Sequence, residues 1–364
     1  MTTNLNTLLR GTEVMRDSDG RVVVQSIRNM ELAFLTVSDR LFSRDEQFAN
    51  PFTALTASNR HYGHVQLRNN ADKDVIFAPQ ISVMTRTSSQ DHALPKSAYI
   101  PSRQAVDYDD AGCVQGSVGG HLRGDSNFRF VPLVIREQLL LEANHTGEYS
   151  HLYHTIENLG KRTRVSTGAY LERYFDHYEV QLQEFIAHFE RPKDCIGVIV
   201  MVDGEIVAID KFPSFTYCAQ VWDLLVRDCY GSVAIVSMAN NRSAAQEFTQ
   251  VLGETNGDLT GVARLRKALR AVFDNRSVRV VERLQDLMLV EFQEERDINS
   301  DDRHYESHIM KAEGYIGQAI RTGEYNHLVS IAKRDAFDPE QWRKAHTAVR
   351  EYRELAAQQR DFTI

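Results

Sequence analysis

The first third of the chain is dominated by short stretches in which apolar and polar residues alternate. Two β-branched runs, Arg21–Ile27 and Leu32–Val37, are followed by a strand–turn–strand pattern over residues 64–84. Prolines and small turn residues separate these runs, as is typical of strand ends and edges. Many short strands with frequent turns predict a β-rich, sandwich-like region over residues 1–132.

From Leu133 the apolar residues recur every three or four positions, which is the helical period. Residues 134–160 predict helix with an interruption at 145–147, and a long amphipathic helix follows. Ser166 or Thr167 is placed to cap its start, and Pro192 follows its end. Its apolar face would be formed by Leu171, Tyr174, Phe175, Tyr178, Leu182, Phe185, Ile186 and Phe189.

The segment Cys195–Phe212 predicts a hairpin. Its centre is Asp203-Gly204, and these residue types favour the two-residue type I′ turn, in which both central residues need a positive φ. A helix with Trp222 on its inner face should follow. Beyond it, residues 232–237 predict a strand, 243–252 and 259–273 predict helices, and 277–292 predict two strands joined near 284–286.

The end of the chain has a helical pattern. Residues 294–302 (EERDINSDD) have the polarity of a linker. Two apolar stripes follow, from Ile309 to Ile320 and from Trp342 to Leu355. We therefore expect an α+β fold. Its core domain would span 1–300, β-rich over 1–132 and mixed over 133–300, and a helical C-terminal extension would span 301–364.

Composition narrows the function classes. The 364 residues are 42% hydrophobic and 25% charged, with a net charge of −8, so a general electrostatic attraction to nucleic acid or to an anionic membrane is not expected. No apolar run is long enough to span a bilayer, and no leader pattern is seen at the start. The four cysteines form no CxxC pair, so we expect a cytoplasmic protein with reduced, mostly buried thiols.

Several segments, in their order along the chain, resemble one protein family. They are VQLRNN (65–70), SSQDH (88–92), GCVQGSVGG (112–120), STGAY (166–170) and GVIVMVDGEIVAIDKF (197–212). They look like the ADP-ribosylglycohydrolase- and rhodanese-phosphatase-associated domain family, over roughly residues 30–290. The resemblance implies a role near NAD and ADP-ribose metabolism by association, and it supplies no mechanism. Asp91-His92 stand where the family leads us to expect arginine, and Gln115 stands where an acid is more usual.

Two of these segments carry the candidate binding residues. Gln90, Asp91 and His92 form a polar cluster in which His92 and Asp91 could act as base and orienting group. In the other segment, Gln115 and the glycines could form a loop whose backbone N–H groups hold phosphate; these glycines are Gly116, Gly119 and Gly120. The alternatives are a solvated connection ending at Pro95 and a sheet connection rich in turns.

Asp210 is the third candidate, because it stands near the end of a strongly apolar run. If the strand continues through it, its carboxylate needs a partner or a raised pKa. If the strand ends at Ala208, Asp210 only caps the following turn. His61, His64, His145, His151 and His154 could in principle hold zinc, but histidines at helical spacing are as easily surface residues, and we predict no metal site.

Two hypotheses of function follow. In the first, the protein binds or processes a nucleotide-type metabolite such as NAD or ADP-ribose. A hydrolytic or glycosyl-transfer step would then use Asp210 or Asp91 as base. In the second, it is a non-catalytic interaction protein or homo-oligomer that associates through its C-terminal helices.

Overall fold

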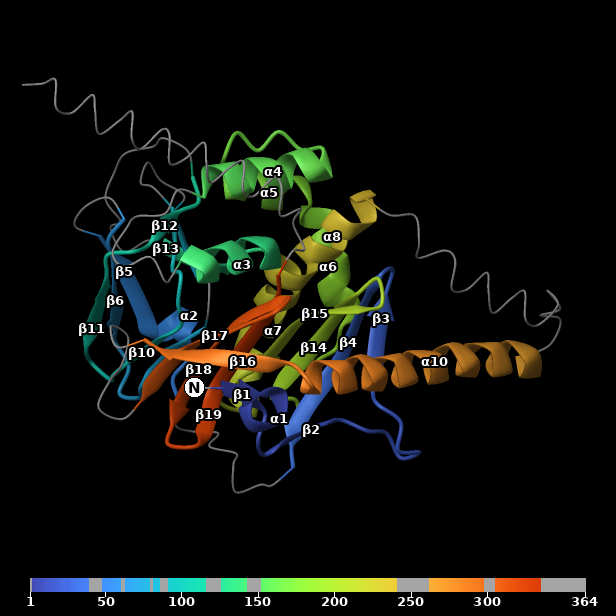
Figure 1. Ribbon diagram of the computed structural model, residues 1–364. Coiled ribbons are helices and arrows are strands. Elements are labelled where there is room, and N and C mark those ends of the chain that lie inside the picture. The colour runs from blue at the N-terminus through green and yellow to red at the C-terminus, as the bar shows by residue number, and fades with distance from the viewer. Residues whose placement is uncertain are drawn as a thin grey trace, which may run out of the picture.

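An antiparallel sheet of ten strands forms the largest layer of the molecule (Figure 1). The computed structural model describes residues 2–38, 48–59, 63–78, 81–85, 91–115, 126–142, 152–240, 262–297 and 305–334. The strands follow the order β1-β16-β17-β18-β19-β15-β14-β4-β2, and β3 also pairs with β4. They are β1 Thr2–Asn4, β2 Thr12–Val14, β3 Val24–Ile27, β4 Met30–Val37, β14 Gly197–Val202, β15 Glu205–Lys211, β16 Glu291–Arg296, β17 Glu306–Ala312, β18 Tyr315–Thr322 and β19 Tyr325–Lys333.

Three smaller antiparallel sheets are built from residues 55–130. Their strand orders are β11-β6-β5, β10-β7 and β12-β9-β8-β13. Figure 1 shows them together at one end of the large sheet. Their strands are β5 Leu55–Ser58, β6 Val65–Asn69, β7 Val75–Phe77, β8 Ile81–Thr85, β9 His92–Ala93, β10 Ala98–Ile100, β11 Ala105–Tyr108, β12 Gly112–Cys113 and β13 Ser126–Phe130.

Helices cover both faces of the large sheet. The long helix α10 packs on one face through Val280, Leu284 and Leu287, while α3, α7, η2 and α8 lie on the other (Figure 1). The π-helix η2 joins α7 to α8 without a break. The helices are α1 Leu5–Leu8, α2 Pro51–Ala54, α3 Leu133–Glu142, α4 Tyr153–Thr163, α5 Leu171–His177, α6 Glu179–His188, α7 Phe215–Leu224, η2 Leu225–Tyr230, α8 Gly231–Asn240 and α10 Val262–Met288.

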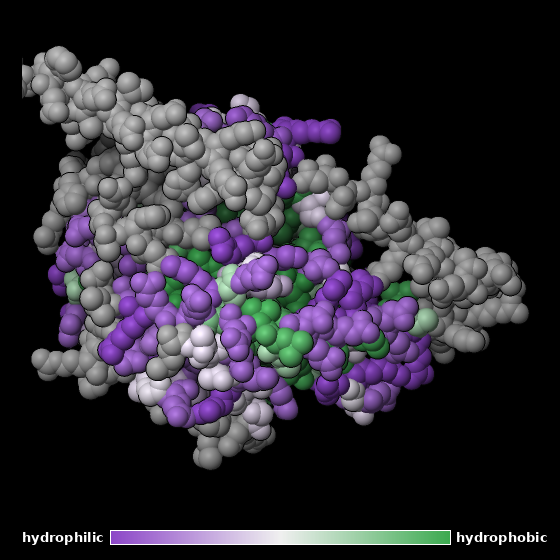
Figure 2. All heavy atoms as spheres, in the orientation of Figure 1, coloured by the Kyte–Doolittle hydropathy of each residue, from purple (hydrophilic) through white to green (hydrophobic). Residues whose placement is uncertain are grey.

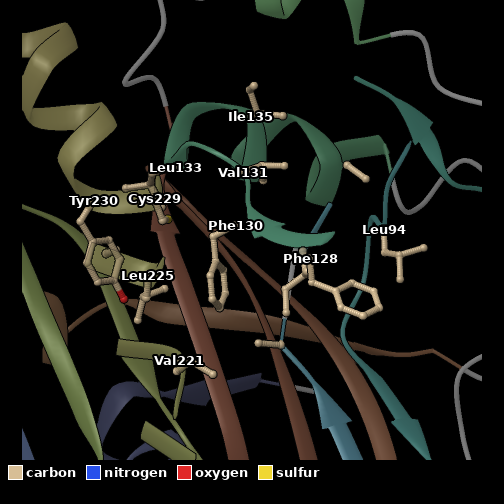
Figure 3. Packing of buried hydrophobic residues seen from close by; sticks show 14 of the residues in the cluster. Leu94, Phe128, Phe130, Val131, Leu133, Ile135, Val221, Leu225, Cys229 and Tyr230 are labelled. Atoms are coloured by element: carbon tan, nitrogen blue, oxygen red, sulfur yellow. The ribbon is translucent and has the colours of Figure 1, made fainter. Parts of the chain in front are cut away.

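The larger hydrophobic core lies between the large sheet, the helices and the small sheets. Figure 3 shows Phe128 and Phe130 of β13 near Val221 and Leu225, which come from α7 and η2. Segments about a hundred residues apart in the chain thus share one core. The outer face shown in Figure 2 is mostly hydrophilic, with a smaller group of hydrophobic side chains near its centre. Within the described residues, no helix is both long and apolar enough to cross a membrane.

The mixed α+β class is confirmed, and so is the hairpin over residues 195–212. Strands β14 and β15 pair in antiparallel fashion around Asp203-Gly204, whose φ angles are 52° and 79°. Both residues therefore occupy the left-handed region, as a type I′ turn requires. Both strands are central in the sheet and buried on both faces, which explains why they appear as nearly continuous apolar runs rather than as alternating patterns.

The prediction of a helical extension over 301–364 is wrong for residues 306–333. These residues form β17, β18 and β19. The stripe from Ile309 to Ile320 resembled a helix face because both faces of these strands are buried in part, so no simple alternation remains. The turns between the strands contain Gly314 and Gly323, with φ angles of 75° and 57°. The stripe from Trp342 to Leu355 lies outside the described residues.

Three further local predictions are wrong. Residues 232–237 belong to helix α8 and not to a strand. The prediction failed because the pattern of a short apolar run fits a buried helix as well as a buried strand. Residues 277–288 end α10, and only β16 follows them, over the end of the second predicted strand and the start of the predicted linker. Neither Ser166 nor Thr167 caps α5, whose N-cap is Tyr170 without a side-chain hydrogen bond. The predicted helix over 243–252 lies outside the described residues.

Candidate functional site

Asp210 lies at the centre of a buried polar cluster. Strand β15 continues through it to Lys211, so the carboxylate points into the large core and is only 1% exposed. Arg136 of α3 donates through Nη1 to both carboxylate oxygens, at 2.9 and 2.8 Å. The Tyr230 hydroxyl, from η2, donates to Oδ2. The alternative in which the strand ends at Ala208 is therefore wrong, and the required partner is Arg136.

The cluster continues across the sheet as a row of polar side chains. Asp210 stands opposite Ser330 on β19, and Ser330 stands opposite Gln318 on β18. Arg136 Nη1 also donates to Ser330 Oγ at 3.1 Å. Gln318 is fully buried; its Oε1 accepts the Ser97 N–H at 2.6 Å and its Nε2 donates to Ser307 Oγ at 2.9 Å. The row thus joins the sheet to α3 and to the segment that leads into β10.

The charges of this cluster stabilise each other. Burial by itself lowers the pKa of Arg136, but the Asp210 carboxylate outweighs this effect and holds that pKa above its ordinary value. Burial raises the pKa of Tyr230 well above its usual range, and the Asp210 charge adds to the rise. Arg136 therefore stays charged and Tyr230 stays a hydrogen-bond donor. A carboxylate with both oxygens bonded in this way is suited to fixing α3 and η2 on the sheet.

A second polar junction brings together two of the predicted candidate segments, which are far apart in the sequence. The Asp91 N–H donates to Gln115 Oε1 at 3.1 Å, and the Val114 N–H donates to the Asp91 carbonyl at 3.2 Å. His92 pairs with Cys113 across β9 and β12. Asp91 and His92 are 2% and 0% exposed. Because two short strands pair here, residues more than twenty positions apart in the chain become neighbours.

The STGAY segment (166–170) leads into a third part of the chain that contacts this junction. The Leu171 N–H donates to the Val114 carbonyl at 3.1 Å. Just before it, Gly168 and Ala169 have φ angles of 56° and 65°, and the Tyr170 N–H donates to the Thr167 carbonyl, as in a type I′ turn. A positive φ costs alanine about 1 kcal/mol, and strained backbone of this kind is often found at functional sites.

Of the predicted site residues, the structure brings Asp91, His92 and Gln115 together. The Asp210 carboxylate instead accepts hydrogen bonds from Arg136 and Tyr230. The predicted ligand residues Gln90, Gly116, Gly119 and Gly120 lie outside the described residues. Arg136 was not predicted from the sequence, where the available signal was a lone arginine inside the apolar run LVIREQLLL.

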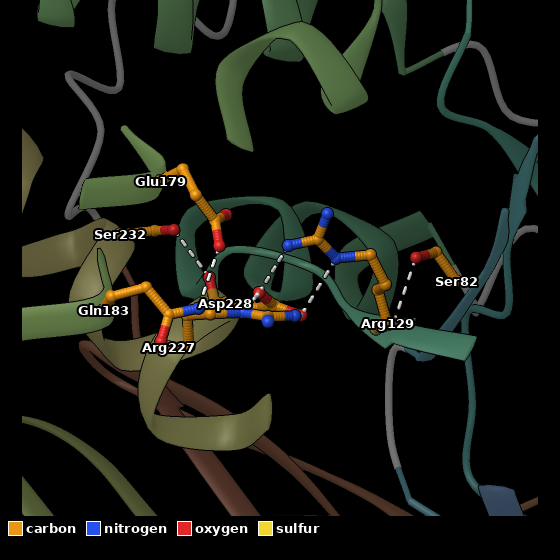
Figure 4. Close-up of polar contacts among 7 residues, drawn as sticks. All are labelled: Ser82, Arg129, Glu179, Gln183, Arg227, Asp228 and Ser232. Atoms are coloured by element: carbon orange, nitrogen blue, oxygen red, sulfur yellow. Dashed lines mark hydrogen bonds and ion pairs between the residues drawn. The ribbon is translucent and has the colours of Figure 1, made fainter. Parts of the chain in front are cut away.

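A third cluster, also missed, surrounds Asp228 of η2 (Figure 4). Its buried carboxylate accepts hydrogen bonds from Arg129 on β13, at 2.8 and 3.2 Å, and from Arg227 beside it, at 2.7 and 3.3 Å. The Arg129 guanidinium also lies 4.0 Å from the centre of the Phe175 ring. Two arginine forks on one aspartate tie β13 to η2 and place Arg129 against α5. The signal for it was a charged pair inside an apolar helical run.

Lys211 is a fourth unexpected feature. It follows Asp210 in the sequence, and its side chain is fully buried. Its Nζ donates to the Asn326 carbonyl and lies 4.5 Å from the centre of the Tyr325 ring. Burial lowers the pKa of Lys211 to about 7.

The metal hypothesis gains no support from the part of the chain that the structure describes, where no three His, Cys, Asp or Glu side chains form a metal-binding group. His64 contacts Asp107 at 2.9 Å, and His154 lies 4.0 Å from Glu157. His61, His145 and His151 lie outside the described residues.

Comparison with known proteins gives one match. The family model described as "ARG and Rhodanese-Phosphatase-superfamily-associated Protein domain" matches residues 23–311. No curated protein and no solved structure matches the chain. The matched range ends before β18 and β19, although β19 pairs directly with β15 and supplies Ser330 to the buried cluster.

Proposed function

Because the chain belongs to the family of ARG and Rhodanese-Phosphatase-superfamily-associated Protein domains, we propose that it binds a nucleotide-type metabolite of NAD or ADP-ribose metabolism. The family name links it by association to ADP-ribosylglycohydrolases. The observation that carries the proposal is the convergence of three segments, around Asp91-His92, Gln115 and Thr167–Leu171, at one junction.

The junction has chemistry suited to such a ligand. Asp91, His92 and Gln115 offer hydrogen-bonding groups that could recognise a ribose or a base, and Gln90 precedes them in the chain. Gln115 leads into the glycine-containing segment with Gly116, Gly119 and Gly120, where backbone N–H groups could hold a diphosphate.

Positive charge lies beside the same turn. Arg173 donates through Nη1 to the Thr167 carbonyl at 3.4 Å, and its guanidinium lies 4.3 Å from the centre of the Tyr170 ring. Arg164, four residues before Gly168, is exposed. These cations support the assignment of a phosphate-bearing ligand, because guanidinium groups match phosphate oxygens in geometry and charge.

A hydrolytic or glycosyl-transfer step remains a prediction within this proposal. Asp91 is the better candidate for its base, because it lies at the junction with Gln115, whereas Asp210 is held by Arg136 and Tyr230. In this arrangement Asp210 would act only by holding α3 and η2 in place.

Calorimetric titration of the whole chain with ADP-ribose, NAD and ADP tests the binding proposal. We expect saturable heat with at least one of them, and an affinity weaker by about tenfold or more in Arg173→Gln, since a charge-assisted hydrogen bond is lost. Arg68→Gln is the matched control, because Arg68 is exposed on β6, which belongs to a different sheet from β9 and β12, the strands next to Asp91 and Gln115. Absence of heat with all three nucleotides would overturn the proposal, and so would equal losses in the two variants.

A further inference from the structure

Two cysteine thiols meet inside the protein. Cys195 Sγ and Cys218 Sγ lie 3.8 Å apart, and both residues are fully buried. Cys195 Sγ also lies 3.1 Å from the Gly197 carbonyl oxygen. If the Cys195 thiol donates to this carbonyl, the Cys218 thiol is left to donate to Cys195. The pair is therefore ordered by hydrogen bonds and not only by packing.

The two sulfurs come from different layers. Cys195 stands just before β14, in a turn closed by its own N–H bond to the Pro192 carbonyl at 3.2 Å. Cys218 stands in the first turns of α7, whose N-cap Ser214 accepts the Tyr217 N–H. A bond between the sulfurs would join the central sheet to the helix that leads into η2.

The pKa values of the two thiols are shifted in opposite directions. The hydrogen bond from Cys218 lowers the pKa of Cys195, against the effect of burial, and nearby Arg191 acts in the same direction as the hydrogen bond. Burial and the hydrogen bond to Cys195 raise the pKa of Cys218 well above its ordinary value. A thiol with a lowered pKa is the one that reacts first with an oxidant, and its neighbour is then the resolving thiol.

The turn directly before Cys195 lies at the surface. Lys193 and Asp194, directly before Cys195, are exposed and lie in a turn. A turn held by few hydrogen bonds opens at a much lower free energy than the core. Opening of residues 192–195 would bring the Cys195 sulfur to solvent without unfolding β14.

We propose that Cys195 and Cys218 are an oxidisable dithiol that forms a disulfide when the protein meets a peroxide. The Cys195 thiolate attacks one peroxide oxygen, the O–O bond breaks, and Cys195 becomes a sulfenic acid. The Cys218 sulfur then attacks the Cys195 sulfur, and the hydroxyl leaves. Two thiols and one hydrogen peroxide give one disulfide and two water molecules. A thiol reductant reverses the change by exchange.

Little movement is needed for this reaction. A disulfide requires a sulfur–sulfur distance of about 2.05 Å, and the sulfurs start 3.8 Å apart. The disulfide would close a loop from Cys195 to Cys218 that contains the whole β14–β15 hairpin. We therefore expect oxidation to stabilise the folded protein and to raise its thermal midpoint, because the crosslink restricts the unfolded chain.

The test treats the purified full-length chain with hydrogen peroxide, then denatures it and blocks all remaining thiols with an alkylating reagent. We expect a loss of two alkylatable thiols, an intact mass lower by two hydrogen atoms before alkylation, and a crosslinked peptide pair containing Cys195 and Cys218. Dithiothreitol should restore all four thiols. The same oxidation should raise the thermal midpoint.

Cys229 supplies the matched control. It is fully buried, and burial raises its pKa to about 12. Cys229→Ser should oxidise like the unmodified protein. Cys195→Ser should keep every remaining thiol, whereas Cys218→Ser should lose only the Cys195 thiol, as a sulfenic acid, and form no crosslink. Four alkylatable thiols after peroxide treatment would overturn the proposal, and so would a crosslink that involves Cys113 or Cys229. If Cys195→Ser does not fold, Cys195→Ala can replace it. The mass measurement needs only the unmodified chain and one folded variant that lacks Cys195.

Discussion

The substitution Asp210→Asn removes one charge from the buried cluster and keeps the shape of the side chain. The Tyr230 hydroxyl can still donate to the amide oxygen, so the principal change is that Arg136, 1% exposed, loses its counter-ion. Leaving one member of a buried ion pair without its partner costs about 3–5 kcal/mol. The whole folding free energy of a protein is about 5–15 kcal/mol, so this single change removes a large share of it.

Urea unfolding followed by circular dichroism measures the effect. We expect the midpoint of Asp210→Asn to fall by about 1 M or more, because the slope with urea is about 3 kcal/mol per molar for a chain of this size. Asp223→Asn is the control, since Asp223 is exposed on α7 and the same substitution there should change stability little. The double variant Arg136→Met with Asp210→Asn removes both charges, so it should recover part of the loss.

A loss in Asp210→Asn below about 1 kcal/mol would refute this reasoning, because Arg136 would then not depend on Asp210. The reasoning would also be refuted if the double variant lost more unfolding free energy than the two single variants lose together. If the nucleotide affinity of a folded Asp210→Asn protein fell sharply while Arg173→Gln bound normally, the binding site would lie at Asp210 and not at the Asp91–Gln115 junction.

Three further outcomes follow from the structure. Since burial lowers the pKa of Lys211 to about 7 from an ordinary 10.5, the unfolded chain binds more protons than the folded one between these values. Stability should therefore rise with pH from about 7 toward 9, and Lys211→Met should abolish this rise in urea melts taken across that range. Gly204→Ala should cost about 1 kcal/mol by the same assay, because φ is 79° there and an added Cβ meets the Arg279 side chain at 3.4 Å. A chain cut after Ala312 should show no cooperative thermal transition, because it lacks β18 and β19; the uncut chain should show one.

The sequence revealed Asp210 but not its partner. An acid in a long apolar run requires compensation, and that requirement can be stated without coordinates. The compensating residue, Arg136 of α3, lies 74 positions before Asp210 in the chain. Ser330, which shares Arg136 with it, lies 120 positions after Asp210. No local pattern encodes such pairings, because they depend on which strands become neighbours and on how α3 lies across them.

The same reason explains why the sequence could single out the residues of the Asp91–Gln115 junction but not their proximity. Asp91, His92 and Gln115 stood out by residue type, and the family resemblance gave their order along the chain. Their proximity depends on the pairing of β9 with β12. Arg129 and Asp228 gave only the weak signal of charges within apolar runs, and their pairing appears only when β13 packs on η2.

What the sequence determined by itself was local. The Asp203-Gly204 turn, the hairpin around it and the helical period after Leu133 follow from φ preferences and side-chain spacing within a few residues. Tertiary structure decided whether a doubly buried apolar run became strand or helix, as at 232–237 and 306–322, because periodicity disappears when both sides of an element are covered. It also decided that the last strands complete the central sheet between β15 and β16. Only that placement makes Asp210, Ser330 and Gln318 cross-strand neighbours and brings Arg136 within hydrogen-bonding distance of Asp210 and Ser330.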